Sequence, residues 1–303
     1  MGTYLHEDVE EFNLIVRVIE KEQGLKREFI IKDYFTVLAL REIIARNPDV
    51  VFKGGTCLSK CYGVIDRFSE DIDLGLEVAH ATEGMRKKLK KAVVGAMDAL
   101  GLTIGNLDKT RSRREFNRYV VSLPLSPIEG DSLIIETAVM SPTAPTDRRV
   151  IVSFVGEYLA ARGRDDLLEQ FGLGPFDLTV NSLERTFCDK VFAVCDYVMG
   201  GESLHRQSRH IYDLYRLLGE VALDDSLLEL LGGVRAQRVG GYRTPSAEPS
   251  VVLSEELRRL VREESYRADY DQVTSPLLYD DLGYDAAISS LTEIAAFLSK
   301  NGL

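Results

Sequence analysis

Two aspartates, Asp71 and Asp73, are the first residues of this chain whose type and spacing could do chemistry. They alternate with Ile72 and Leu74 in a short run that predicts a β-strand. Alternate side chains of a strand point to the same face, so both carboxylates should share one face of a sheet. Two acids in that position repel each other unless a positive charge lies between them. The usual solution is a divalent cation with oxygen ligands, and Mg²⁺ typically brings phosphates with it.

A glycine turn precedes these acids. The apolar run 50–52 is followed by Gly54, Gly55 and Thr56, and then by a helix-compatible segment at 57–65. Glycines at a helix start let backbone N–H groups approach a ligand, and the helix N-terminus favours an anion. The stretch therefore predicts strand, phosphate-binding turn, short helix and strand.

Glu136 supplies a third candidate carboxylate. It stands inside the apolar run 132–139, which predicts another strand. A lone glutamate is costly to bury unless it is paired or bound to a metal. We therefore predict that Glu136 completes a metal site with Asp71 and Asp73. The alternative is an edge strand that leaves Glu136 in solvent.

The segments 53–60 and 68–73 closely resemble the AbiEii/AbiGii family of toxin nucleotidyltransferases, which belongs to the polymerase-β-like superfamily. The glycine pair, the lysine, the serine and both aspartates occur in the family's order and spacing. The resemblance implies an α+β fold, with a mixed sheet flanked by helices and a mainly helical C-terminal lobe. It implies a Mg²⁺-dependent enzyme that transfers NMP from an NTP. The NTP would be bound by Gly54, Gly55, Thr56, Lys60, Ser69 and Lys190, and two Mg²⁺ ions by Asp71, Asp73 and Glu136.

Two later segments resemble the family's third and fourth motifs. The first, 184–190, implies that Lys190 contacts the nucleotide, and the second, 209–217, implies that Asp213 faces the cleft. From the residues alone, Lys190 lies at the edge of an apolar stripe, where a lysine either extends to solvent or points into a site. Asp213 lies one turn from Arg209, and an exposed ion pair is the ordinary explanation. We predict that Asp71, Asp73, Lys190 and Asp213 are catalytic.

The resemblance also implies the acceptor and the partner. The acceptor would be an RNA, the tRNA 3′ end above all, with blocked translation and growth as the outcome, and a cognate antitoxin would accompany the toxin. Four arginines at 111–118 could hold the triphosphate or RNA phosphates, or form a flexible surface loop. For the basic run 86–91, a solvated helical face is favoured over an RNA-binding patch. Transfer to a small molecule or a protein hydroxyl stays an alternative, as does a non-catalytic binding module, although the acid pair argues against the latter.

Composition limits the class of protein. With 303 residues, 45% of them hydrophobic, the chain can form one large domain or two packed lobes. We predict a catalytic lobe at 1–150 and a helical lobe at 151–303 that completes the cleft. The net charge of −11 excludes a generic nucleic-acid binder unless basic residues are concentrated locally. The N-terminus lacks a signal peptide and no apolar run approaches a membrane span, so we expect a cytoplasmic protein. We also expect a monomer.

The four cysteines do not have C-x-x-C spacing, so buried thiols are favoured over a zinc site. They are Cys57, Cys61, Cys188 and Cys195. The pair Lys32–Asp33 begins an ordinary helix, and a solvated ion pair is the favoured explanation. Periodicity predicts helices at 7–23, 30–46, 82–101, 153–170, 182–199, 208–218, 254–267 and 285–299. Strands are predicted at 119–125 and 176–180, turns at 141–149 and a loop at 233–250.

Overall fold

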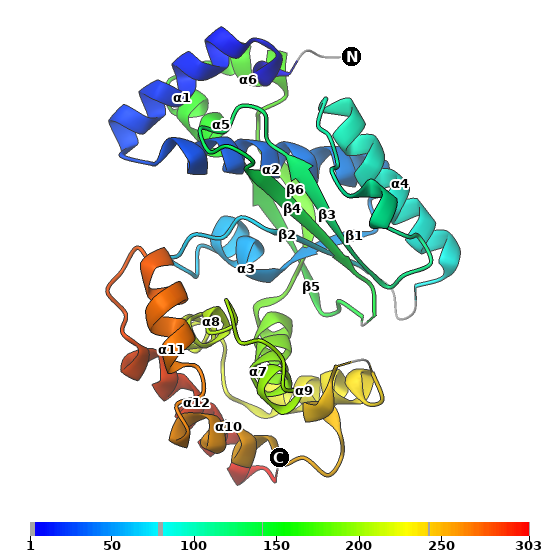
Figure 1. The fold of residues 1–303 in the computed structure, drawn as a ribbon, viewed down its shortest axis with the longest axis vertical. Coiled ribbons are helices and arrows are strands. Elements are labelled where there is room, and N and C mark those ends of the chain that lie inside the picture. Colours follow the sequence, from blue (N-terminus) through cyan, green and yellow to red (C-terminus); the bar gives the residue numbers. More distant parts are fainter. Residues whose placement is uncertain (1–3, 78–80, 141, 242, 303) are drawn as a thin grey trace. The chain divides into compact units, whose positions relative to one another are not determined.

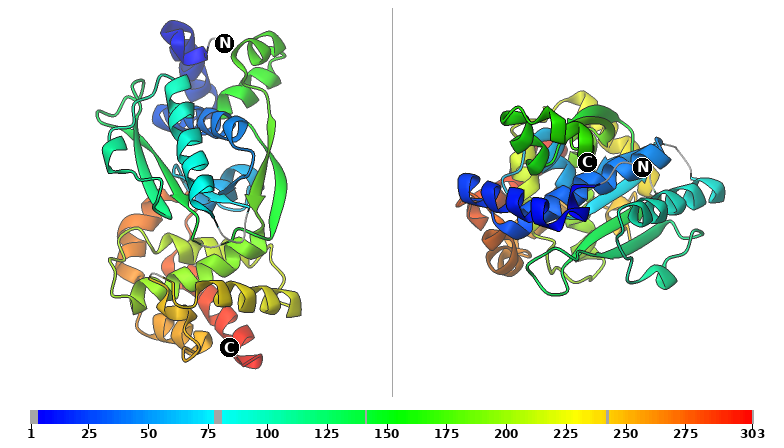
Figure 2. Two further views of the ribbon diagram at one scale, coloured as in Figure 1. Left: turned by 90° about the vertical axis from the view of Figure 1, so that its right-hand side faces the viewer. Right: turned by 90° about the horizontal axis from the view of Figure 1, so that it is seen from above.

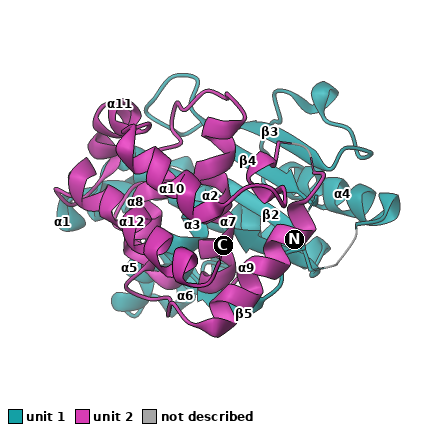
Figure 3. Cartoon of the chain, turned by 90° about the horizontal axis from the view of Figure 1, so that it is seen from below, with its two compact units in different colours: residues 1–61, 70–180 teal, residues 62–69, 181–303 magenta. Residues whose placement is uncertain are grey.

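The structure, a computed structural model, describes residues 4–77, 81–140, 142–241 and 243–302. The chain divides into two compact units, coloured separately in Figure 3. Unit 1 comprises residues 1–61 and 70–180, and unit 2 comprises residues 62–69 and 181–303. Unit 1 holds a mixed sheet flanked by helices and unit 2 is mainly helical, so the predicted α+β fold is confirmed. Unit 1 extends past residue 150, and the roles given to the lobes 1–150 and 151–303 stay predictions.

The sheet of unit 1 has six strands in the order β3-β4-β2-β1-β6-β5. The central pair β1–β2 is antiparallel, the pairs β1–β6 and β2–β4 on either side of it are parallel, and β3–β4 is antiparallel. The strands are β1 (Val50–Lys53), β2 (Ile72–Leu76), β3 (Phe116–Ser122), β4 (Ser132–Ala138), β5 (Thr146–Ile151) and β6 (Phe176–Asn181). Burial alternates along β4, and Ile72 and Leu74 of β2 are fully buried. The face that carries the acids is therefore opposite the apolar face, as the alternation predicts.

Helix α2 is central to the helices of unit 1, because it packs against α1, α4 and α5 (Figures 1 and 2). More than half of its residues are buried, which explains a sequence with little polar patterning. The helices of the unit are α1 (Val9–Gln23), α2 (Arg27–Arg46), α3 (Gly54–Cys57), α4 (Glu83–Ala99), α5 (Phe154–Ala161) and α6 (Asp165–Phe171). A π-helical turn, Leu58–Tyr62, follows α3, and 3₁₀ turns occur at Leu5–Glu7 and Leu107–Lys109.

Unit 2 is organised around α7 and α12. Helix α7 packs against α8 and α9, and α12 packs against α8 and α10. The helices are α7 (Leu183–Met199), α8 (Arg209–Leu217), α9 (Asp225–Arg238), α10 (Leu253–Arg262), α11 (Arg267–Asp269) and α12 (Tyr284–Lys300). Shorter turns lie at Pro245–Ala247, Tyr270–Thr274 and Ser275–Leu277. In the described part of the chain, no helix is both long enough and apolar enough to span a bilayer.

Four segments differ from the predicted elements. Strand β5 occupies part of the predicted turns at 141–149, of which residue 141 lies outside the described residues. Only Ile151 of β5 is buried, so the strand has no apolar alternation. Helix α9 enters the predicted loop at 233–250, because the buried Leu227, Leu231 and Val234 continue one apolar face past Gly232 and Gly233. The predicted helix 153–170 is two helices separated at Gly163, where φ is +64°. The predicted helix 57–65 is α3 with its π-helical turn.

The predicted solvated pair Lys32–Asp33 is also wrong. The side chain of Lys32 is largely buried and its Nζ lies 2.5 Å from Glu70 and 2.8 Å from Asp131. Glu70 directly precedes the acids at the start of β2, and Asp131 directly precedes β4. One buried lysine therefore joins the starts of the two parallel strands. The charge of Lys32 and its hydrogen bond help to lower the pKa of Asp131, although burial alone would raise it.

We expect Lys32→Met to destabilise the protein by about 2–3 kcal/mol, because two largely buried carboxylates lose their common cation. The matched control is Lys21→Met, an exposed position of α1, with a change within about 0.5 kcal/mol. Urea unfolding measures both. The pKa of Asp131 is lower in the folded protein than in the unfolded chain. The stability that the Lys32–Asp131 pair contributes should therefore be present at neutral pH and be lost as the pH falls through the folded pKa. Equal stability of the two variants would contradict the stabilising role of Lys32.

Candidate active site

A row of four charged residues crosses one face of the sheet in unit 1. Lys53 of β1 pairs with Asp73 of β2, Asp73 pairs with Glu136 of β4, and Glu136 pairs with Arg118 of β3. Residues directly opposite each other on paired strands project to the same face. The row therefore runs positive, negative, negative, positive, with the two carboxylates side by side at its centre.

Glu136 shows the electrostatic cost of this arrangement. Burial and the negative charges of Asp73 and Asp71 raise its pKa to about 7, against the opposing charges of Arg118 and Lys53. The Nε of Arg118 lies 3.4 Å from the Glu136 carboxylate. Strand β4 lies between β3 and β2, so the alternative of an edge strand with Glu136 in solvent is excluded. Asp71, immediately before β2, is close enough to contribute to the same field.

The glycine turn lies directly against Asp73. Gly54 has φ of +79°, a left-handed conformation, and a Cβ at this position would stand 2.0 Å from a carboxylate oxygen of Asp73. Only glycine meets both requirements. Helix α3 begins at Gly54 and includes Gly55 and the buried Thr56. Chain geometry thus brings the predicted phosphate-binding turn beside the predicted metal-binding acids, within one unit.

The donor chemistry of this cluster fits a hard divalent cation. Its groups are carboxylate oxygens, and burial together with the negative charges of Asp73 and Asp71 raises the pKa of Glu136, so an added cation would stabilise its ionised form. Within residues 4–77, 81–140, 142–241 and 243–302, no three His, Cys, Asp or Glu side chains are grouped closely enough to hold a metal ion. The fit is thus one of ligand type and charge, and Asp71, Asp73 and Glu136 as metal ligands stay a prediction.

Lys60 has partners of its own in unit 1. Its Nζ lies 2.7 Å from the carboxylate of Asp33 and 4.1 Å from the ring centre of Phe154. The same carboxylate accepts a hydrogen bond from the Phe154 backbone N–H. Lys60 therefore fixes the turn after α3 to α2 and α5, and its role toward NTP stays a prediction.

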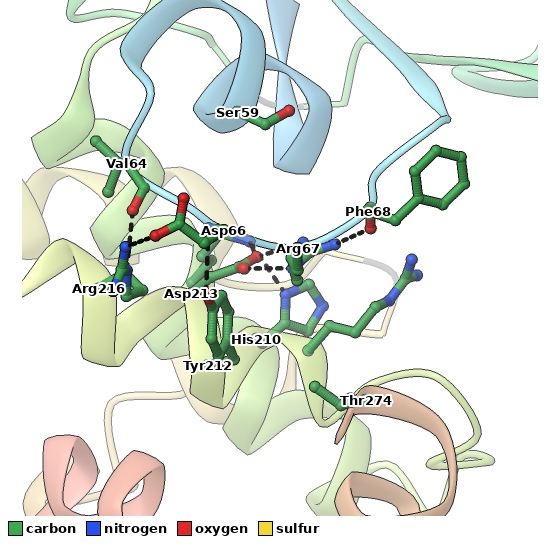
Figure 4. A network of polar contacts seen from close by, with 12 residues as sticks. Ser59, Val64, Asp66, Arg67, Phe68, His210, Tyr212, Asp213, Arg216 and Thr274 are labelled. Atoms are coloured by element: carbon green, nitrogen blue, oxygen red, sulfur yellow. Dashed lines mark hydrogen bonds and ion pairs between the residues drawn. The ribbon is translucent and has the colours of Figure 1, made fainter. Parts of the chain in front are cut away.

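Unit 2 holds a second charged cluster around Asp213 of α8, which is fully buried (Figure 4). Arg67 donates two hydrogen bonds to its carboxylate, from Nε at 2.7 Å and from Nη2 at 2.8 Å. Lys190 of α7 donates a third, from Nζ at 2.6 Å. Burial alone would raise the pKa of Asp213, but these two cations lower it well below its usual range. The expectation of an exposed Arg209–Asp213 pair is therefore wrong.

The surroundings of Lys190 exclude an extension to solvent. Its side chain is buried, and burial lowers its pKa despite the adjacent Asp213. The Nδ1 of His210 lies 3.4 Å from Nζ, and burial and the Lys190 charge depress the pKa of that imidazole. His210 is thus neutral where it meets the lysine. The roles of Lys190 and Asp213 toward a nucleotide stay predictions.

Arg67 is the residue that sequence reasoning missed. It lies on segment 62–69, which is held in unit 2 by backbone bonds from Phe68 N to Leu277 O and from Tyr279 N to Asp66 O. The Tyr212 hydroxyl accepts the Asp66 N–H, and Arg216 contacts the Asp66 carboxylate (Figure 4). Arg67 and Asp213 are 146 positions apart, so no local pattern could connect them.

The other candidate groups lie as follows. Cys57, Cys188 and Cys195 are buried free thiols, as predicted, and Cys61 is half-buried. In the arginine loop, Arg111 and Arg114 donate to backbone carbonyls of residues 108–110. These bonds give the loop local order, and its role toward phosphates stays a prediction. Ser69 is assigned to unit 2, and its role also stays a prediction.

We expect Asp73→Asn to lower the pKa of Glu136 from about 7 toward its ordinary value, because one of the two neighbouring negative charges is removed. The ¹³C chemical shift of the Glu136 carboxyl, followed by NMR titration, measures this. Mg²⁺ bound among these acids should lower the same pKa in the unmutated protein, so its binding should tighten as pH rises through 7. Asp177→Asn, at an exposed acid of β6 in the same sheet, is the control. An unchanged pKa of Glu136 in Asp73→Asn would show that the charge of Asp73 does not act on Glu136.

We expect Asp213→Ala to destabilise the protein by about 3–5 kcal/mol, because Arg67 and Lys190 would be left buried without a counter-charge. The triple variant Asp213→Leu with Arg67→Met and Lys190→Met should recover most of that loss, since it removes all three charges together. Thermal and urea unfolding test this pair of variants. A triple variant no more stable than Asp213→Ala would show that the cost arises from lost packing instead.

Comparison with known proteins adds the family. A fold search matches MenT4, a nucleotidyltransferase toxin from Mycobacterium tuberculosis H37Rv, with a TM-score of 0.58 and 18% identity, over 94% of this chain and 89% of that one. At that identity the likeness shows the fold. No curated protein matches the sequence. Residues 39–290 match the family described as "Nucleotidyl transferase AbiEii toxin, Type IV TA system". That match covers most of the chain, including both charged clusters, and the protein belongs to the AbiEii family of nucleotidyltransferase toxins.

Proposed function

We propose that this toxin transfers a nucleoside monophosphate from an NTP to a hydroxyl of an RNA acceptor, with the tRNA 3′ end as the first candidate. The observation that carries the proposal is the carboxylate pair Asp73 and Glu136, held side by side next to the Gly54 turn. Family membership supports the reaction type, the NTP substrate and an antitoxin partner. The RNA acceptor and the resulting block of translation and growth rest on the resemblance. We place the reaction in the cytoplasm, where NTPs and tRNA are available.

The reaction is a substitution at the α-phosphorus. The acceptor oxygen forms a bond to this phosphorus, the bond to the bridging oxygen breaks, and pyrophosphate leaves. Two Mg²⁺ ions bound by Asp71, Asp73 and Glu136 would lower the pKa of the attacking hydroxyl and stabilise the leaving group. The backbone N–H groups of Gly54, Gly55 and Thr56 would hold the β- and γ-phosphates.

Residues of unit 2 would neutralise charge on the nucleotide and keep Lys190 in position. Lys190 would neutralise charge on the nucleotide, and its pKa, lowered by burial, makes its protonation depend on Asp213. Asp213 would therefore keep Lys190 charged and oriented, with Arg67 fixing the carboxylate from the other side. Arginines of the loop 111–118 would attract RNA phosphates.

We expect Asp71→Ala to reduce nucleotide incorporation by about 100-fold or more. Even residues that only support metal ligands typically cost 10- to 100-fold when they are replaced. The assay incubates the protein with each α-³²P-labelled NTP and total RNA, and identifies the labelled species on a gel. Asp177→Ala should label RNA at the unmutated rate. A folded Asp71→Ala protein that still labels RNA would refute the metal assignment. If the unmutated protein labels a protein or a small molecule instead of RNA, the assignment of RNA as the acceptor is refuted.

A further inference from the structure

A hollow of about 810 Å³ lies on unit 1, and none of its lining residues belongs to the row of charged residues. Helix α4 supplies most of its polar lining, with one residue from the end of α2 and one from the arginine loop. The basic and loop residues are Arg46, Lys87, Lys88, Lys90, Lys91 and Ser112. Its only acidic lining residue in the described chain is Asp98. The lining thus has a strong excess of positive charge.

Part of this charge is already held by the protein. Lys88 lies 2.8 Å from Asp49, and Lys90 donates to the Thr110 backbone oxygen at 2.9 Å. Lys87 and Lys91 are exposed, and no ion pair or hydrogen bond joins either side chain to another described residue. They stand four residues apart on α4 and so share one face of the helix. Two adjacent ammonium groups therefore point to solvent without a counter-charge.

The hollow belongs to a basic region in an acidic protein. Residues 83–118 contain ten Lys and Arg and four Asp and Glu, a net charge of +6, while the remaining residues carry −17. In sequence the region leads toward the acids: Ser112 lines the hollow, the loop leads into β3, and Arg118 on β3 lies beside Glu136. Positive side chains thus recur along the chain from α4 to β3, within one unit.

We propose that the lysine face of α4, formed by Lys87 and Lys91 at this hollow, docks the sugar-phosphate backbone of the RNA acceptor, remote from its reacting end. The proposal rests on the proposed function. Lysine ammonium groups contact phosphates as point charges, which fixes position without reading sequence. No aromatic side chain lines the hollow among the described residues, so it has no platform on which bases could stack. Backbone docking is therefore the form of RNA binding that this surface fits.

The test measures RNA affinity apart from catalysis. Total tRNA labelled with a fluorophore at its 5′ end is titrated with protein, and anisotropy is followed at several KCl concentrations. Lys87→Glu with Lys91→Glu should weaken binding about 10-fold or more near 100 mM KCl. The slope of log K against log salt should become shallower by about 1 to 2, since two phosphate contacts are lost. Affinity for NTP in Mg²⁺, measured by calorimetry, should be unchanged.

The matched control is Arg17→Glu with Lys21→Glu. This pair is also exposed and four residues apart, on α1 of the same unit, and gives the same change in net charge. It should keep tRNA affinity within about twofold. Equal loss in both variants, an unchanged affinity in the α4 variant, or a matching loss of NTP affinity would each overturn the proposal. So would lost binding of the antitoxin with intact tRNA binding, because the surface would then dock a protein.

The two proposals fail separately. An unmutated protein that binds tRNA through Lys87 and Lys91 but labels no RNA would refute the acceptor assignment and keep the docking surface. A protein that labels RNA while the α4 variant binds and labels it normally would refute the docking surface alone.

Discussion

The repulsion between carboxylates on one sheet face is the constraint on which unit 1 depends. Parallel pairing of β2 and β4 sets Asp73 directly beside Glu136, and the backbone cannot relieve that contact without breaking the register. Three features of the chain hold the arrangement. Lys32 joins the two strand starts, Lys53 and Arg118 flank the pair, and Gly54 leaves room for the Asp73 carboxylate. Even with these features, burial and the charges of Asp73 and Asp71 raise the pKa of Glu136.

In unit 2 the charges are opposite in sign and compensate each other. There a single carboxylate, Asp213, is buried with two cations, and every oxygen of it accepts a hydrogen bond. A buried charge is tolerated when it is paired and hydrogen-bonded in this way. The cluster of unit 2 is thus saturated at its carboxylate, whereas the cluster of unit 1 still favours added positive charge. The cluster of unit 2 suits the positioning of Lys190, and the cluster of unit 1 suits the binding of a cation.

Local patterns predicted the parts of the site that depend on neighbouring residues. Each of three patterns can be recognised within a few residues: the alternation around Asp71 and Asp73, the glycine turn, and the apolar run around Glu136. The structure places Asp73, Glu136 and Gly54 together. What the sequence did not reveal depends on long-range contacts. Arg67 and its partner are 146 positions apart, and Lys32, the cation shared by Glu70 and Asp131, lies 38 residues before Glu70 and still farther before Asp131. Strand β5 was missed because an exposed strand has no apolar period.

Charge segregation gives the acidic composition a physical meaning. A protein with net charge −11 repels a polyanion over most of its surface, and the repulsion extends roughly 8–10 Å at physiological salt. Residues 83–118 invert that sign, so an approaching RNA would be favoured in one orientation and disfavoured in the others. A uniformly basic protein would bind RNA in many unproductive orientations. An acidic chain with one basic region that ends beside its carboxylates can instead guide a charged acceptor to the site while binding nucleic acid weakly elsewhere.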